Sequence, residues 1–282
     1  MVYFYGEGVQ RDLEGILSRG RLAAVDAIGR WMNDKLHYYL DLSTLLYLAF
    51  KEIVAEREKG FSLVLEITLR QIYFTGVEAL KVVTLVSLAL GTIVIVEVGS
   101  QVALLGGVQF ISTILVVVII RELGPLLTAI IVIGRSGTAI AAELGNMIVA
   151  HELEAIRVMG INPVYFIVTP RIIGVTIAVI CLTIYFNAVA LLGGFVVSKL
   201  ILPADLPVFL RELMVSLTVT DLVLAILKSA AFGLLIALTC TYHGLTVRYS
   251  SIEVPQVATR GVVSAILSII LFNVLLTLLF YL

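Results

Sequence analysis

The chain has 282 residues, of which 60% are hydrophobic and 14% are charged, and its formal net charge is -1. A water-soluble domain of this size could not hide so much apolar side chain from solvent. The composition therefore excludes a soluble globular protein, and the near-zero net charge gives no indication of a nucleic-acid partner. We expect an integral membrane protein.

Residues 1–76 are predicted to form amphipathic or interfacial helices on the cytosolic side. In residues 12–35, apolar side chains recur at helical spacing and basic side chains occupy other positions. No continuous apolar segment of a cleavable signal peptide is present there, so we expect a cytosolic N-terminus. Both this helix and the next suit the membrane surface, where basic residues meet anionic headgroups. A helical hairpin packed on a partner protein is the alternative. The apolar face of the second helix consists of Leu42, Leu45, Leu46, Ala49 and Ile53.

Five stretches reach or approach the roughly 20 apolar residues that a membrane-spanning helix needs. The third stretch is longer than one crossing requires, so we expect it to tilt or to begin in the interface. Residues 61–76 contain Glu66 and Arg70, which favours an interfacial helix entering the first span over a sixth crossing. The predicted fold is an all-α membrane protein with a transmembrane permease domain at 77–282. The predicted spans are residues 77–104, 108–134, 163–198, 213–242 and 260–282.

The distribution of Lys and Arg predicts the orientation of the spans. With the N-terminus in the cytosol, the outer loops hold only Lys199 and Arg211, as expected if basic residues resist translocation. Five crossings then place the C-terminus on the periplasmic side. A six-span arrangement would put Arg135, Arg157 and Arg171 outside, against this rule.

The connection between the second and third spans, residues 134–171, changes character along its length. Small residues dominate its start and would allow helices to approach closely. A short polar helix follows and is expected to end at Gly160. Such a helix on the cytosolic side suits docking into the groove of a partner protein. An ordinary solvated connection explains the same residues equally well. The polar residues of this helix are His151, Glu152, Glu154 and Arg157.

Three runs in this part of the chain resemble the signature of the MlaE family, the permeases of MCE-type ABC transporters that move phospholipids in double-membraned bacteria. The runs are RELGPLLTA (121–129), GRSGTAIAAELGNM (134–147) and VMGINPVYFIVTPR (158–171). The resemblance covers about 77–282. It implies a homodimer in the bacterial inner membrane, a cytosolic P-loop ATPase partner, a periplasmic MCE-domain partner and a phospholipid substrate.

The resemblance also implies that residues 143–160 transmit the movement of the ATPase. The family commonly opens its coupling helix with an EQ[IL]-type sequence, whereas this chain has a His-Glu-Leu-Glu sequence there, so we expect the docking chemistry to differ in detail. No lysine lies in a P-loop setting, so we expect no enzymatic activity, no catalytic residue and no cofactor, with ATP bound by the partner. The predicted coupling residues are Glu143, His151, Glu152, Leu153, Glu154, Ile156 and Arg157.

No metal site is predicted either. His151-Glu152 begins like the zinc-binding sequence H-E-x-x-H, but Ala155 stands where the second histidine is required.

Charged residues at membrane depth point to a second functional region, because each costs a few kcal/mol unless it is paired or wetted. Arg121 and Glu122 lie in the second predicted span, Lys228 in the fourth and Asn273 in the fifth. The resemblance implies that these four residues line the lipid cavity. The arginine and the lysine could then receive a phosphate headgroup. An internal salt-bridge cluster that holds helices together is the alternative.

Three other charged residues near the spans give weaker indications. Glu78 and Lys81 are about one helical turn apart, which favours a local pair without a function. Asp221 stays undecided between a functional contact and simple exposure to water.

Together, the residues and the resemblance predict the permease subunit of an ATP-driven phospholipid transporter. Lipid is expected at the dimer interface, between the first, second and fifth spans. The alternative is an ion-coupled secondary carrier or channel that acts without an ATPase. A membrane scaffold is a third possibility.

Overall fold

The computed structural model describes residues 33, 35–53, 61–105, 113–201, 211, 213–248 and 250–281. The chain divides into two compact units, Met1–Tyr47 and Leu48–Leu282. In the first unit the described residues are helical, and this helix continues to residue 53. It covers most of the second amphipathic helix that the sequence predicts. The first predicted helix, at 12–35, lies outside the described residues except for positions 33 and 35.

The first apolar run is one continuous helix that changes character at a single turn. α2 (Phe61–Gly76) continues through the 3₁₀ turn η1 (Val77–Ala79) into α3 (Leu80–Leu105). Its apolar part, Ser62–Val98, has 37 residues. At 1.5 Å per residue this part is about 55 Å long, well beyond a hydrocarbon core of about 30 Å. α2 therefore extends the first span at its entry and is not a sixth crossing.

The second apolar run is longer than predicted and contains two π-helical segments. The sequence predicts an end at residue 134, whereas the helix continues through the stretch Thr113–Val149. The small residues after 134 do not begin a loop, because Ser136 and Gly137 are buried within the helix. The elements of this run are η2 (Val116–Leu123, π-helical), α5 (Gly124–Val132), η3 (Ile133–Gly137, π-helical) and α6 (Thr138–Val149).

Three further apolar helices complete the second unit. In the described part of the chain, five helices in all are long and apolar enough to cross a membrane. The prediction of an all-helical protein with five spans and a short helix between spans two and three is confirmed. The remaining elements are α7 (Glu152–Val158), η4 (Val164–Val168, π-helical), α8 (Thr169–Ile201), α10 (Val219–Leu245) and α11 (Glu253–Tyr281).

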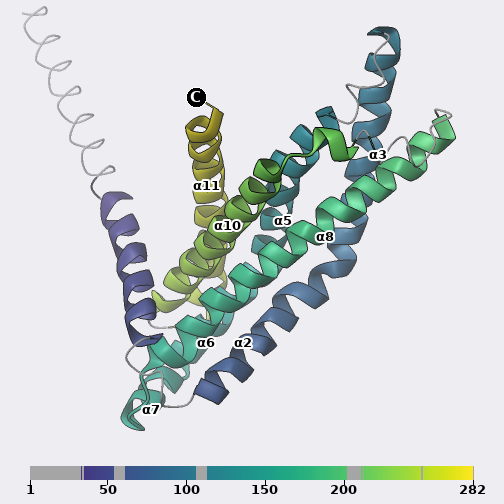
Figure 1. Ribbon diagram of the computed structural model, residues 1–282. Helices are drawn as coiled ribbons and strands as arrows, with labels where there is room; N and C mark the ends of the chain where they lie inside the picture. The colour runs from purple at the N-terminus through teal and green to yellow at the C-terminus, as the bar shows by residue number, and fades with distance from the viewer. Residues whose placement is uncertain are drawn as a thin grey trace, which may run out of the picture. The chain divides into compact units, whose positions relative to one another are not determined.

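Helix α8 is the centre of the packing in this unit (Figure 1). It lies against α2, α3 and α10, and α10 in turn packs against α6 and α11. The helices approach so closely that some crossings accept only glycine. A Cβ atom on Gly91 of α3 would lie 2.0 Å from the backbone oxygen of Ala190 in α8. Small residues at such crossings allow membrane helices to gain van der Waals contact.

Substitution of Gly91 by alanine is expected to force α3 and α8 apart. The added methyl group meets backbone, which cannot rotate away, so we expect a loss of about 1–3 kcal/mol in stability. A lower melting temperature of the purified protein in detergent would show this loss. Gly134→Ala is the matched control, because a Cβ atom there meets nothing within 4 Å. Equal melting temperatures for the two variants would contradict the close contact.

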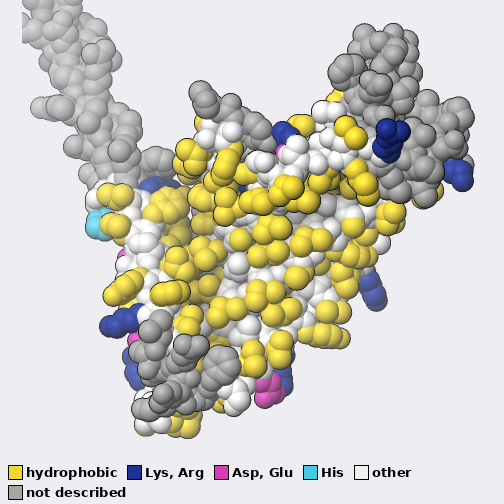
Figure 2. All heavy atoms as spheres, in the orientation of Figure 1, with side chains coloured by type: hydrophobic (Ala, Val, Ile, Leu, Met, Phe, Trp, Pro, Cys, Tyr) yellow, Lys and Arg dark blue, Asp and Glu magenta, His cyan; other side chains and the backbone are white. Residues whose placement is uncertain are grey.

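The outer surface of these helices is apolar. Figure 2 shows hydrophobic side chains over the face formed by α2, α8 and α10, with charged side chains at its margins. Leu85 is 71% exposed and Leu192 is 63% exposed. A soluble monomer rarely exposes a contiguous apolar surface of this extent. Lipid is the solvent that this surface requires, which confirms a multi-pass membrane protein.

Candidate functional site

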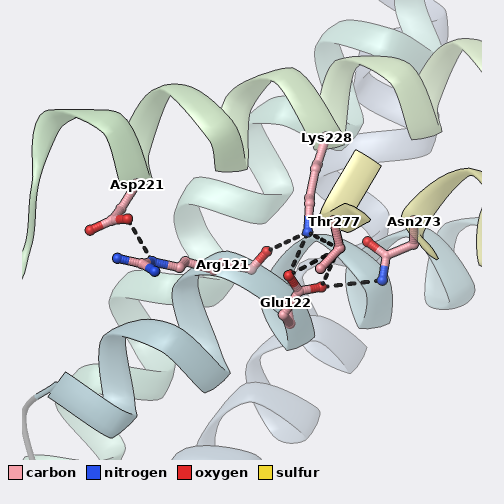
Figure 3. Close-up of polar contacts among 6 residues, drawn as sticks. All are labelled: Arg121, Glu122, Asp221, Lys228, Asn273 and Thr277. Carbon is pink, nitrogen blue, oxygen red and sulfur yellow. Dashed lines mark hydrogen bonds and ion pairs between the residues drawn. The ribbon is translucent and has the colours of Figure 1, made fainter. Parts of the chain in front are cut away.

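A network of polar side chains joins three spans inside the apolar bundle (Figure 3). Lys228 of α10 donates from Nζ to Glu122 Oε1 at 2.6 Å and to Thr277 Oγ1 at 3.0 Å. Asn273 of α11 donates from Nδ2 to Glu122 Oε2 at 3.2 Å. The Thr277 hydroxyl lies 3.2 Å from Glu122 Oε1. One carboxylate in η2 therefore holds both α10 and α11.

An ion pair between Arg121 and Asp221 belongs to the same network, because Lys228 Nζ also donates to the Arg121 backbone oxygen at 3.3 Å. Arg121 Nε lies 2.5 Å from Asp221 Oδ1. The Asp221 carboxylate is fixed by a capping box at the start of α10: its Oδ2 accepts from the backbone N–H of Thr218 at 3.0 Å and from the Thr218 hydroxyl at 2.8 Å. The pair ties the first turn of α10 to η2.

The charges of the network balance. Arg121 is paired with Asp221, and Lys228 is paired with Glu122, as buried charges require. Each pair has one enclosed and one partly open member. The side chains of Asp221 and Lys228 are 2% and 4% exposed, whereas those of Arg121 and Glu122 are 22% and 29% exposed. An approaching anion would therefore meet Arg121 first, and it would reach Lys228 only by displacing Glu122.

All four residues that the sequence predicts for the lipid cavity belong to this network. The structure adds Asp221, which the sequence leaves undecided, and Thr277, for which the sequence predicts no role. Helical spacing could have found both. Asp221 and Lys228 are two turns apart on α10, and Thr277 is one turn from Asn273 on α11, so each pair shares a face. The contacts fit both a headgroup site and a structural cluster, so the predicted lipid-binding role stays a prediction.

A second contact joins the other π-helical segment of the same span to the first span. Arg135 of η3 donates from Nη1 to the Phe74 backbone oxygen at 2.7 Å and pairs with Glu78. Its guanidinium group lies 5.0 Å from the centre of the Phe74 ring. The predicted pair between Glu78 and Lys81 is thus replaced by a pair across helices. π-helical segments are rare overall, but those that occur are often found at functional sites. In this span, η2 and η3 each carry an ion pair to another helix.

Helix α7 is an exposed projection between α6 and α8. Tight turns set it apart at both ends: His151 before it has a φ of 57°, and Gly160 after it has a φ of 78°. None of its residues is buried. Val158 and Met159 at its end are 88% and 67% exposed and form an apolar tip that was not predicted from the sequence. Of the predicted coupling residues, Leu153 and Ile156 are half-buried, and His151, Glu152, Glu154 and Arg157 are exposed.

Glu143, the remaining predicted coupling residue, lies on α6 and not on α7. Its Oε1 lies 2.8 Å from Nη2 of Arg171 in α8. The Arg171 side chain is 9% exposed and also donates to the Ile167 backbone oxygen at 3.0 Å. Glu143 therefore joins the two helices that flank α7, next to the predicted docking helix.

Long apolar helices and an apolar outer surface define a polytopic integral membrane protein, and a balanced internal charge network joins three of its spans. The Permease MlaE family model matches residues 68–279, and the chain belongs to this family. It is similar to a probable ABC transporter permease protein of Rickettsia prowazekii, with 28% identity over 219 residues that cover 78% of this chain and 85% of the relative.

Two other relatives extend this comparison. A probable ABC transporter permease protein of Synechocystis is 29% identical over 210 residues, which cover 74% of this chain and 80% of the relative. The chloroplastic protein TRIGALACTOSYLDIACYLGLYCEROL 1 of Arabidopsis thaliana is 29% identical over 214 residues, which cover 76% of this chain and 61% of the relative. The resemblance to the MlaE family is confirmed. The chain is a permease of the ABC transporter type, which works with a separate ATPase.

Proposed function

We propose that the chain is the permease of an ATP-driven, MCE-type transporter that moves phospholipid between the inner membrane and the periplasm or outer membrane. The observation that carries this proposal is a charge-balanced network, partly open, within an apolar helical bundle. An amphipathic substrate needs both features. The family supports the ABC class, and the Arabidopsis relative bears the name of a glycerolipid.

The network offers a phosphate group one direct approach. The Arg121 side chain is 22% exposed while it pairs with Asp221, and a planar guanidinium can bind a phosphate through two parallel hydrogen bonds. The buried Asn273 Oδ1 has no hydrogen-bond partner among the described residues, but as an acceptor it suits a hydroxyl or ammonium group of the headgroup and not the phosphate. In this proposal the headgroup lies beside η2 and α11, and ATP-driven closure expels the lipid.

The exposed face of α11 next to the network supports a homodimer. Four large apolar residues on α11 lie close in sequence to Asn273 and are each about half or more exposed. A second copy that covers this face would enclose the network and create a lipid cavity between the first, second and fifth spans. These four residues are Leu271, Val274, Leu275 and Leu278.

Helix α7 supplies the contact with the ATPase in this proposal. Its exposed carboxylates and apolar tip suit a groove with basic and apolar walls. The Glu143–Arg171 pair joins α6 to α8 beside α7, so a displacement of α7 would move the ends of spans two and three together. With α7 in the cytosol, the N-terminus is cytosolic, the C-terminus is periplasmic, and the MCE-domain protein lies at the opposite end of the bundle.

Purification of the protein from its native membrane in mild detergent tests the proposal. Mass spectrometry should identify a P-loop ATPase, an MCE-domain protein and phospholipid in the purified material. Recovery of the chain alone, under conditions that keep other membrane complexes intact, would contradict it and favour an ion-coupled carrier.

A further inference from the structure

A cavity of about 360 Å³ lies between α8, α10 and η2. Its wall includes Ile120 of η2, Ile184 and Leu191 of α8, and Leu222 and Ile226 of α10. Ile184 is 55% exposed and Ile226 is 43% exposed, so the cavity opens toward the outer surface of the bundle. Between membrane spans, that surface is in contact with lipid.

Water is a poor occupant of this cavity. A water molecule takes up about 30 Å³ and needs two to four polar partners, and apolar cavities stay dry. Two hydroxyl groups of the wall are already used, because Thr183 donates to the Val179 backbone oxygen and Ser229 to the Ile226 backbone oxygen. An empty cavity would leave its wall without dispersion contacts. A flexible hydrocarbon chain from the bilayer restores those contacts.

Asn187 provides one unsatisfied polar group at the same place. Its side chain lines the cavity, and its buried Oδ1 has no hydrogen-bond partner among the described residues. This oxygen is pressed against η2 and α5, because a Cβ atom on Gly124 would lie 2.0 Å from it. The amide nitrogen of Asn187 is therefore the polar atom of this side chain that is left to line the cavity. An N–H donor within an apolar wall is suited to a carbonyl oxygen attached to a hydrocarbon chain.

We propose that this cavity binds one acyl chain of a membrane glycerolipid, with the Asn187 amide nitrogen donating to the ester carbonyl of that chain. The site is separate from the predicted transport cavity, since it lies between spans two, three and four. It adjoins the Arg121–Asp221 pair, because the neighbouring residues Ile120 and Leu222 line its wall. The inference needs the membrane spans but not the proposed transport activity.

Lipid counting by native mass spectrometry tests this site. The full-length protein would be delipidated by detergent exchange and incubated with phosphatidylcholine or, in a separate arm, with oleic acid. We expect Ala188→Phe, which fills the cavity from its exposed rim, to remove one bound phosphatidylcholine per protomer. Ala89→Phe is the matched control, because Ala89 is an exposed alanine of α3 outside the cavity. It should bind as many lipids as the unmodified protein.

Asn187→Leu tests the hydrogen bond with a side chain of similar shape. The loss of one hydrogen bond of about 1 kcal/mol should weaken phosphatidylcholine binding about fivefold. This variant also keeps the proposal testable if Ala188→Phe does not fold. Unchanged lipid counts and affinity in both folded variants would overturn the proposal. Binding of oleic acid but not of phosphatidylcholine would overturn it as well, since the occupant would then be a free fatty acid.

Discussion

Substitution of Lys228 by methionine is expected to produce the largest loss of stability in the bundle. Methionine preserves much of the lysine side chain's length but leaves the Glu122 carboxylate without its cation. The Lys228 side chain is 4% exposed and lies 2.6 Å from that carboxylate. Removal of one partner from a buried ion pair costs about 3–5 kcal/mol. Thermal unfolding of the purified protein in detergent measures this effect.

The double variant Lys228→Met with Glu122→Gln separates a structural role from a functional one. It removes both charges and keeps an amide that can still bond with Asn273 and Thr277, so we expect most of the lost stability to return. If Lys228 contacts the phosphate, phospholipid binding should remain at least about tenfold weaker, because a charge-assisted hydrogen bond contributes about 1.5–3 kcal/mol. Binding equal to that of the unmodified protein would show that the Lys228–Glu122 pair is only structural.

Reversal of charge on α7 is expected to release the ATPase. Glu152→Lys with Glu154→Lys places two cations where the exposed carboxylates stand, and like charges facing each other across an interface cost several kcal/mol. We expect the amount of co-purified ATPase to fall at least about tenfold. The two side chains are not part of the helix packing, since none of the residues of α7 is buried. The permease itself should therefore remain folded.

Glu66→Lys is the matched control for the α7 variant. Glu66 is an exposed carboxylate on α2, with a side chain 65% exposed against 75% for Glu154. Its contact with Arg70 is a surface pair, which contributes little to stability. The control should retain the full amount of ATPase. Equal retention by the α7 variant would contradict the coupling assignment.

The number of spans could be predicted from the sequence because apolar length is a strong signal. The end of the second span could not. Ser136 and Gly137 have the composition of a loop, but in membrane helices small residues provide close packing. A Cβ atom on Gly137 would lie 2.8 Å from Cys240 Sγ of α10, so the glycine serves the contact with α10. Such contacts depend on a distant part of the chain.

The polar network could be predicted in part for a related reason. Charges at membrane depth are costly, so Arg121, Glu122 and Lys228 stand out in the sequence. The sequence does not show which residues pair with which, because partner choice follows from packing. Glu78 has Lys81 nearby on its own helix, yet it pairs with Arg135 from another span. The π-helical segments could not be predicted from the sequence either. Gly124, directly after η2, is packed against Asn187 of α8, a residue far from it in the sequence.

Transfer of phospholipid by the reconstituted complex tests the central claim most directly. Vesicles would contain the permease with its co-purified ATPase and a fluorescent phospholipid. The MCE-domain protein would be added outside the vesicles, where it can accept or donate phospholipid. We predict that lipid moves between vesicle and partner when ATP is hydrolysed, and that a non-hydrolysable analogue stops this movement. Lipid movement that does not depend on ATP and depends instead on an ion gradient would contradict an ATP-driven transporter.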